Sequence, residues 1–155
     1  MEIPERVRHS LTGQTLLLVE DNEDEVFMMK RAFRKANVTN PLQVVTNGEE
    51  ALAYLEGRDR YADRKQFPFP LVVFLDLNLP KKSGFEVLES VRQHPVLKKI
   101  TIYILSSSTR PADVERAALL GANGYFIKPT QLEKLQELVE KWYSLAQFKA
   151  YPVGT

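Results

Sequence analysis

The sequence predicts an α/β domain in which a five-stranded parallel sheet has helices on both faces. Five short apolar runs lack the polar alternation of a strand with one solvated face, which is typical of parallel strands buried on both sides. Each run is followed by a segment with helical periodicity, and such alternation requires crossover connections. The natural small solution is a doubly wound, three-layer sandwich with strand order 2-1-3-4-5.

The predicted strands are short apolar runs that stop at polar or turn-forming residues. The first run ends in an acidic cluster, and the third ends on a carboxylate. The fourth ends at three consecutive serines, and Lys128 and Pro129 stop the fifth. In chain order, the predicted strands span residues 15–20, 42–45, 71–76, 100–105 and 125–127.

The predicted helices follow from apolar residues three and four positions apart and from capping residues. Asn47 stands at an N-cap position with Glu50 three residues later, and Pro111 stands at a first helical position. Thr130 and Glu133 form a capping box. The helices are expected over 24–36, from 47, over 84–93, from 111 to about 120, and from 130 through 142. Residues 57–70 are predicted to form a long loop.

Composition and charge are those of one ordinary globular domain. The 155 residues are 44% hydrophobic and 26% charged, and the net charge is +1, so neither nucleic acid nor an anionic membrane is an expected partner. Without cysteine there are no disulfides or thiolate metal sites. No secretory signal or membrane-spanning run is recognised, which favours the cytoplasm. The expected domain covers 14–146, between an N-terminal extension (1–13) and a C-terminal tail (147–155).

Reactive side chains follow the predicted strands at their carboxyl ends. Glu20 and Asp21 come after the first strand, Asp76 after the third, Ser106 after the fourth and Lys128 after the fifth. In open α/β sheets the ligand site lies at this edge. We therefore expect three carboxylates, one hydroxyl and one ammonium to lie close together.

This set of groups is suited to phosphoryl transfer. Clustered carboxylates repel one another unless a cation is present, and Mg²⁺ prefers oxygen ligands. Glu20 and Asp21 are therefore candidate Mg²⁺ ligands, which leaves Asp76 to act as a nucleophile and form an aspartyl phosphate. Lys128 would neutralise phosphoryl oxygens, and Ser106 would donate a hydrogen bond to one of them.

Four segments, in this order along the chain, resemble the response-regulator receiver domain, which has a flavodoxin-like fold. They span residues 19–22, 74–80, 105–107 and 125–129, and the resemblance covers about 14–145. The resemblance implies that Asp76 is the phosphoacceptor and that Lys128 is the lysine of the site. It implies a metal site formed by Glu20, Asp21, Asp76 and the backbone carbonyl of Asn78. The implied ion is Mg²⁺, with Mn²⁺ or Ca²⁺ as substitutes.

The same resemblance implies a conformational switch. Ser106 is similar to the switch hydroxyl, Tyr125 to the aromatic switch residue of the fifth strand, and a cis peptide is implied before Pro129. Phosphorylation would change the face formed by the fourth helix, the fifth strand and the fifth helix. Because Asp76 is itself modified and no separate substrate is turned over, we do not expect an enzyme.

A narrower resemblance is to the small stand-alone regulators paired with bacterial and cyanobacterial phytochromes. It is carried by the loop at 57–70, the stretch 79–84, and the aromatic residues Trp142 and Tyr143. It implies a phytochrome histidine kinase as the phosphodonor. The output would be a protein partner or a homodimer, formed through the switch face and the C-terminal aromatic residues.

Several alternatives remain open at this point. Tyr125 could be an ordinary core tyrosine, Trp142 and Tyr143 could simply pack the last helix, and the domain could be a pseudo-receiver that never meets phosphate. A flavin carrier is disfavoured because Glu20 and Asp21 would repel its phosphate. A phosphatase of the Asp-x-Asp type is disfavoured because Asn78 occupies the second position. A DNA-binding regulator is disfavoured because the receiver leaves no room for an output domain.

Overall fold

Five short parallel strands form one sheet in the order β2-β1-β3-β4-β5. The computed structural model describes residues 13–150. The predicted strand order and the parallel pairing are confirmed. The strands are β1 (Leu16–Val19), β2 (Leu42–Val45), β3 (Val72–Leu75), β4 (Thr101–Ser106) and β5 (Gly124–Ile127).

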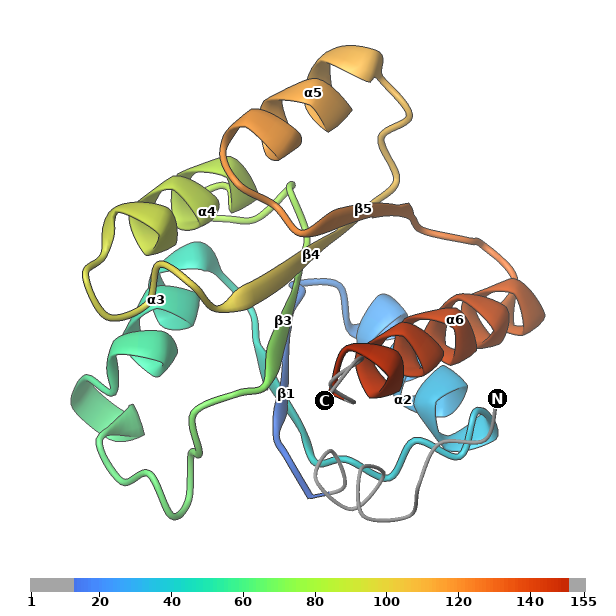
Figure 1. Ribbon diagram of the computed structural model, residues 1–155, viewed down its shortest axis with the longest axis horizontal. Helices are drawn as coiled ribbons and strands as arrows, with labels where there is room; N and C mark the ends of the chain where they lie inside the picture. The colour runs from blue at the N-terminus through green and yellow to red at the C-terminus, as the bar shows by residue number, and fades with distance from the viewer. Residues whose placement is uncertain (1–12, 151–155) are drawn as a thin grey trace, which may run out of the picture.

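Within residues 13–150, five helices cover the two faces of the sheet, as the doubly wound prediction requires. They are α2 (Glu23–Lys35), α3 (Gly48–Glu56), α4 (Gly84–Gln93), α5 (Pro111–Leu119) and α6 (Leu132–Ala150), with a short 3₁₀ turn η1 (Asp59–Tyr61). Figure 1 shows α2 and α6 on one face and α3, α4 and α5 on the other. The three layers of the predicted sandwich are therefore present.

The central strands are buried on both faces because their side chains alternate between two cores. In β1, Leu17 and Val19 face the core beneath α3, α4 and α5, whereas Leu16 and Leu18 face the core beneath α2 and α6. All four residues of β1 are buried, as are all four of β3. Both faces therefore require apolar residues, which is why these strands read as continuous apolar runs.

The Asn47 cap at the start of α3 is confirmed, but Glu50 has a different partner from the one expected in a capping box. The Glu50 N–H donates a 2.8 Å hydrogen bond to Asn47 Oδ1. The Glu50 carboxylate does not reach back to the cap; it accepts a hydrogen bond from the Tyr61 hydroxyl. A residue eleven positions along the chain therefore takes the place of the local contact.

The segment predicted as a long loop contains the turn η1 and contributes to the core. Tyr61 is buried, with ring centroids 5.1 Å from Tyr54 and 5.0 Å from Phe67. The prediction missed this because charged residues outnumber the aromatic ones in 57–70. Three aromatic rings are enough to hold the segment against α3, and they provide apolar burial that short loops lack.

Arg64 donates hydrogen bonds to backbone carbonyls at the end of α3. Its guanidinium donates to the carbonyls of Tyr54 and Leu55 at 2.8 Å each and to that of Phe67 at 3.1 Å. The last turn of α3 holds no basic residue of its own. A cation brought from the following loop therefore caps the helix and complements its dipole.

We expect Arg64→Met to lower the free energy of unfolding by about 2 kcal/mol, because hydrogen bonds from a charged donor to partly buried carbonyls are lost. Urea denaturation measures this value. Lys65→Met is the matched control, since Lys65 is exposed and a surface change away from such contacts costs less than about 0.5 kcal/mol. Equal losses in the two variants would contradict the capping role.

Trp142 packs the last helix onto the sheet, which decides between the two interpretations left open for it. Its ring is 2% exposed and lies edge-on to Phe74 and Phe33. Trp142 is therefore a core residue and offers no free surface for a dimer contact, whereas Tyr143 beside it is half-buried. The expected dimer contact through the C-terminal aromatic residues is therefore wrong for Trp142, because its ring is buried in the aromatic core beneath α6.

The C-terminal tail and the peptide bond before Pro129 both differ from the predictions. Helix α6 extends to Ala150, so the expected tail at 147–155 begins inside the helix. Within residues 13–150 there is no cis peptide, so the expectation of one before Pro129 is wrong; the trans form is intrinsically favoured. Over the same residues, no helix is both long and apolar enough to cross a membrane.

Candidate functional site

Parallel pairing brings four of the predicted site residues to one edge of the sheet. Glu20 follows β1, Asp76 follows β3, Ser106 ends β4, and Lys128 follows β5. Ladder hydrogen bonds extend to this edge: the Asp76 N–H donates to the Val19 carbonyl at 3.1 Å, and the Lys128 N–H to the Ser106 carbonyl at 2.8 Å. Glu20, Asp76 and Ser106 are only 2%, 6% and 0% exposed. The backbone that carries these side chains is therefore hydrogen-bonded to the neighbouring strands, which holds the side chains at the edge of the sheet.

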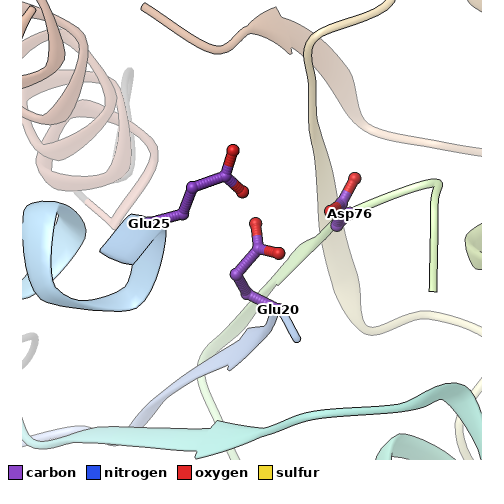
Figure 2. A group of neighbouring side chains, drawn as sticks. All are labelled: Glu20, Glu25 and Asp76. Atoms are coloured by element: carbon purple, nitrogen blue, oxygen red, sulfur yellow. The ribbon is translucent and has the colours of Figure 1, made fainter. Parts of the chain in front are cut away.

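Lys128 lies at the centre of the cluster and contacts three carboxylates. Its ammonium donates to Glu20 Oε1 at 2.5 Å, to Glu25 Oε2 at 2.6 Å and to Asp76 Oδ2 at 3.1 Å. These partners come from the ends of β1 and β3 and the first turn of α2, as Figure 2 shows. One cation thus links three separate elements, and the four groups together carry excess negative charge.

Glu25 was not among the predicted site residues, although it lies with Glu20 and Asp76. Within the part of the chain that the structure describes, these three carboxylates offer oxygens within 4.8 Å of one another. Asp21 is exposed and lies outside this group. A signal for Glu25 was present: it is three residues after the α2 N-cap Asn22, and that position turns a side chain back toward the cap and the strand end.

Crowding of carboxylates changes their protonation. Burial and a hydrogen bond with Glu25 raise the pKa of Glu20 to about 8, while the same hydrogen bond lowers the pKa of Glu25. The crowding therefore favours the protonated form of Glu20 and the charged form of Glu25. Burial acts to lower the pKa of Lys128, but its hydrogen bonds with Glu20 and Glu25 outweigh this effect and raise it. Lys128 is therefore a permanent cation.

The backbone after β3 approaches Asp76 closely, which requires glycine at position 84. A Cβ atom on Gly84 would lie 2.3 Å from the Asp76 carbonyl oxygen and 2.7 Å from the Leu77 Cα. The Gly84 N–H donates to the Leu77 carbonyl at 2.9 Å, and the Asn78 N–H donates to Asp76 Oδ1 at 3.2 Å. This tight turn holds Asp76 and the Asn78 backbone beside each other. The metal-ligand role of the Asn78 carbonyl stays a prediction.

Ser106 and Tyr125, the predicted switch residues, both contact the segment after β4. Ser106 Oγ accepts a hydrogen bond from the Ser108 N–H at 3.1 Å. The Tyr125 hydroxyl donates to the Ser108 carbonyl at 3.0 Å, and its ring packs against the core beneath α3, α4 and α5. The ring therefore has a packing role and the hydroxyl a specific partner. Their function as a switch stays a prediction.

The donor set of the site fits a hard divalent cation. Every anionic donor is a carboxylate oxygen, and thiolate ligands are excluded because the chain has no cysteine. The single ammonium of Lys128 does not balance the carboxylates of Glu20, Glu25 and Asp76. Magnesium and manganese ions accept such oxygen ligands and would remove the remaining repulsion.

Two sequence relatives cover most of the chain. One is the protein named "Probable methanogenesis regulatory protein FilR2" of Methanothrix harundinacea, which is 36% identical over 129 residues, or 81% of this chain and 79% of the relative. The other is response regulator Rcp1 of Synechocystis sp., 32% identical over 127 residues, or 82% of this chain and 84% of the relative. The similarity therefore extends over about four-fifths of the length of both relatives.

Solved structures agree with these relatives. The phosphorylated cyanobacterial phytochrome response regulator RcpA is 30% identical, with a TM-score of 0.80 over 93% of this chain and all of that chain. The Mn²⁺-bound form of Rcp1 is 32% identical, with a TM-score of 0.75 over 84% of this chain and 92% of that one. The family model of the response regulator receiver domain matches residues 16–140. The chain therefore belongs to the response regulator receiver domain family.

Proposed function

We propose that this chain is a stand-alone two-component response regulator that accepts a phosphoryl group on Asp76. The observation that carries the proposal is the contact of the Lys128 ammonium with a buried Asp76 at the carboxyl edge of the sheet. Glu20 lies beside them, and buried Ser106 ends the neighbouring strand β4. A nucleophile, a cation, acidic ligands and a hydroxyl donor are the groups that phosphoryl transfer to an aspartate uses.

The proposed reaction modifies the protein itself. A carboxylate oxygen of Asp76 attacks the donor phosphorus; the new O–P bond forms as the N–P bond of a phosphohistidine breaks, and the electron pair stays on the imidazole nitrogen. Lys128 neutralises one phosphoryl oxygen, and Ser106 donates a hydrogen bond to another. No separate substrate is turned over, so the protein is not an enzyme in the ordinary sense.

A divalent cation completes this proposal. Glu20, Asp21, Asp76 and the backbone carbonyl of Asn78 would hold Mg²⁺, which when bound neutralises charge on the transferred group. The Mn²⁺-bound form of the relative Rcp1 supports a hard cation at this edge. Mn²⁺ and Ca²⁺ are the expected substitutes.

The proposed donor is a sensor histidine kinase of the phytochrome type, in the cytoplasm. The similar protein RcpA is a cyanobacterial phytochrome response regulator, which supports this pairing. We propose that the output is phosphorylation-dependent protein contact, including homodimerisation, through the face of α5, β5 and α6. Exposed apolar side chains on two of these elements support an interaction role: Val114 and Leu119 on α5, and Ile127 on β5.

The first test is phosphate incorporation from acetyl phosphate, followed by intact mass and size-exclusion chromatography. We expect the wild type to gain one phosphoryl group in the presence of Mg²⁺ and none in EDTA. Asp76→Asn is expected to gain none under either condition, because an amide is not a nucleophile for this reaction. Asp59→Asn, at an exposed acid in η1, is the matched control and should behave as wild type.

Other results of the incorporation experiment would each contradict a different part of the proposed function. Incorporation that persists in Asp76→Asn would place the acceptor elsewhere. Incorporation that is unchanged by EDTA would remove the cation from the mechanism. A wild type that takes up no phosphate from acetyl phosphate or from a phosphorylated kinase would leave an interaction module of the pseudo-receiver kind.

A further inference from the structure

Ser108 makes contacts with three elements that the proposed switch has to connect. Its N–H donates to Ser106 Oγ at the end of β4, at 3.1 Å. Its carbonyl accepts from the Tyr125 hydroxyl on β5, at 3.0 Å. Its own hydroxyl donates to Asp113 Oδ2 in the first turn of α5, at 2.6 Å. Each polar group of this half-buried residue is thus bonded to a different element.

The contact with Asp113 fastens a helix that lacks the usual cap. The N-cap position of α5 is Arg110, whose side chain makes no capping hydrogen bond. Ser108 Oγ accepts from the Arg110 N–H at 3.3 Å while donating to Asp113, so it supplies a cap from two residues upstream. A hydrogen bond to a carboxylate is stronger than one between neutral groups. The start of α5 is therefore tied to Ser108 and not to its own first residue.

We propose that Ser108 is the positioning residue that couples the phosphorylation site to helix α5. The coupling runs from Ser106, through the backbone of Ser108, to its hydroxyl and Asp113. This inference rests on the proposed function, since a phosphoryl group on Asp76 is what would draw the Ser106 hydroxyl toward it. When Ser106 Oγ moves, the Ser108 N–H that it accepts from moves as well, and the Asp113 contact transmits that shift to the first turn of α5.

Three alternative routes from the phosphorylation site to α5 are weaker. Ser107 lies between the two serines in sequence, but it is exposed. The Arg110–Asp113 ion pair is 3.8 Å long, with an Arg110 side chain that is largely exposed, so it contributes little. Tyr125 contacts the Ser108 carbonyl but belongs to β5, so it responds to the movement of Ser108 without holding α5 itself.

The test is hydrogen–deuterium exchange of residues 109–119, with and without acetyl phosphate and Mg²⁺. We expect wild-type exchange in this segment to change on phosphorylation. In Ser108→Ala, exchange should be about tenfold faster before phosphorylation, since a hydrogen bond to a charged group is lost. It should then no longer respond to phosphate, although phosphate incorporation stays within about twofold of wild type. Ser107→Ala is the matched control and should follow the wild type.

A double-mutant cycle assigns the effect to one contact. Asp113→Ala should reproduce Ser108→Ala, and combining the two substitutions should add nothing further. If Ser108→Ala and wild type exchange equally before phosphorylation, the hydroxyl does not fasten α5 and the inference is overturned, whether or not Asp76 accepts phosphate. If exchange in Ser108→Ala still responds to phosphate as in wild type, the coupling is overturned while the proposed function stands. Absence of phosphate from the wild type would instead overturn the proposed function.

Discussion

Replacement of Lys128 by methionine is expected to lower the free energy of unfolding by about 3 kcal/mol in EDTA. The ammonium contacts Glu20, Glu25 and Asp76, and two of these carboxylates are almost fully buried. Methionine preserves much of the side-chain volume but removes the ammonium that contacts all three carboxylates. Three carboxylates drawn from separate elements would then face one another across the sheet edge, and their repulsion favours the unfolded chain.

Added Mg²⁺ should raise the free energy of unfolding more in Lys128→Met than in the wild type, because a divalent cation replaces the missing charge. Phosphate incorporation should still fall roughly 100-fold, since charge stabilisation of the transferred group is lost. Urea denaturation with and without Mg²⁺ measures the first effect, and intact mass the second. Lys134→Met, on the exposed side of α6, serves as the control. A Lys128→Met protein as stable as wild type in EDTA would show that the carboxylates do not need this cation.

Truncation of Trp142 to alanine is expected to cost about 4 kcal/mol of folding stability. The indole is 2% exposed and lies 5.0 Å from the Phe74 ring and 6.1 Å from the Phe33 ring, nearly perpendicular to both. Removing it leaves a cavity where α6 packs on β3 and α2. Burial of an aromatic ring and its edge-to-face contacts are lost together.

Circular dichroism during urea denaturation is the suitable measurement, because Trp142 is the only tryptophan and the variant loses that fluorescence signal. Leu145→Ala, one turn further along α6, is the control; Leu145 is 44% exposed and its loss should cost less than about 0.5 kcal/mol. Trp142→Phe should recover part of the stability. A loss in Trp142→Ala no greater than that in Leu145→Ala would mean that the C-terminal part of α6 does not contribute to the core.

Local features of this protein were predicted correctly from the sequence, whereas several long-range contacts were not. The Asn47 cap, Pro111 at the first position of α5 and the apolar runs of the central strands were all recognised from neighbouring residues. The two helix starts depend on contacts within a few positions along the chain, and burial of a central strand on both faces leaves a continuous apolar run in its own sequence. A pattern of neighbouring residues is therefore sufficient evidence for each of them.

The contacts of the segment 57–70 could not be predicted in the same way. Tyr61 bonds to Glu50, and Arg64 caps a helix that ended eight residues before it. Nothing in the sequence of the segment indicates which carbonyls the guanidinium will reach. The carbonyls that Arg64 reaches depend on the path of the segment across α3, and the packing of three aromatic rings sets that path.

At the site, the sequence was sufficient to bring Glu20, Asp76, Ser106 and Lys128 to one edge, because parallel strands place their carboxyl ends together. It was not sufficient to show that Glu25 lies in the cluster while Asp21 is exposed, or that Ser108 connects three elements. The positions of the strands follow from patterns of hydrophobicity along the chain, and right-handed crossovers then leave few possible strand orders. Side-chain partners depend on distances of a few ångströms between elements far apart in sequence, and those distances exist only once helices and sheet have packed.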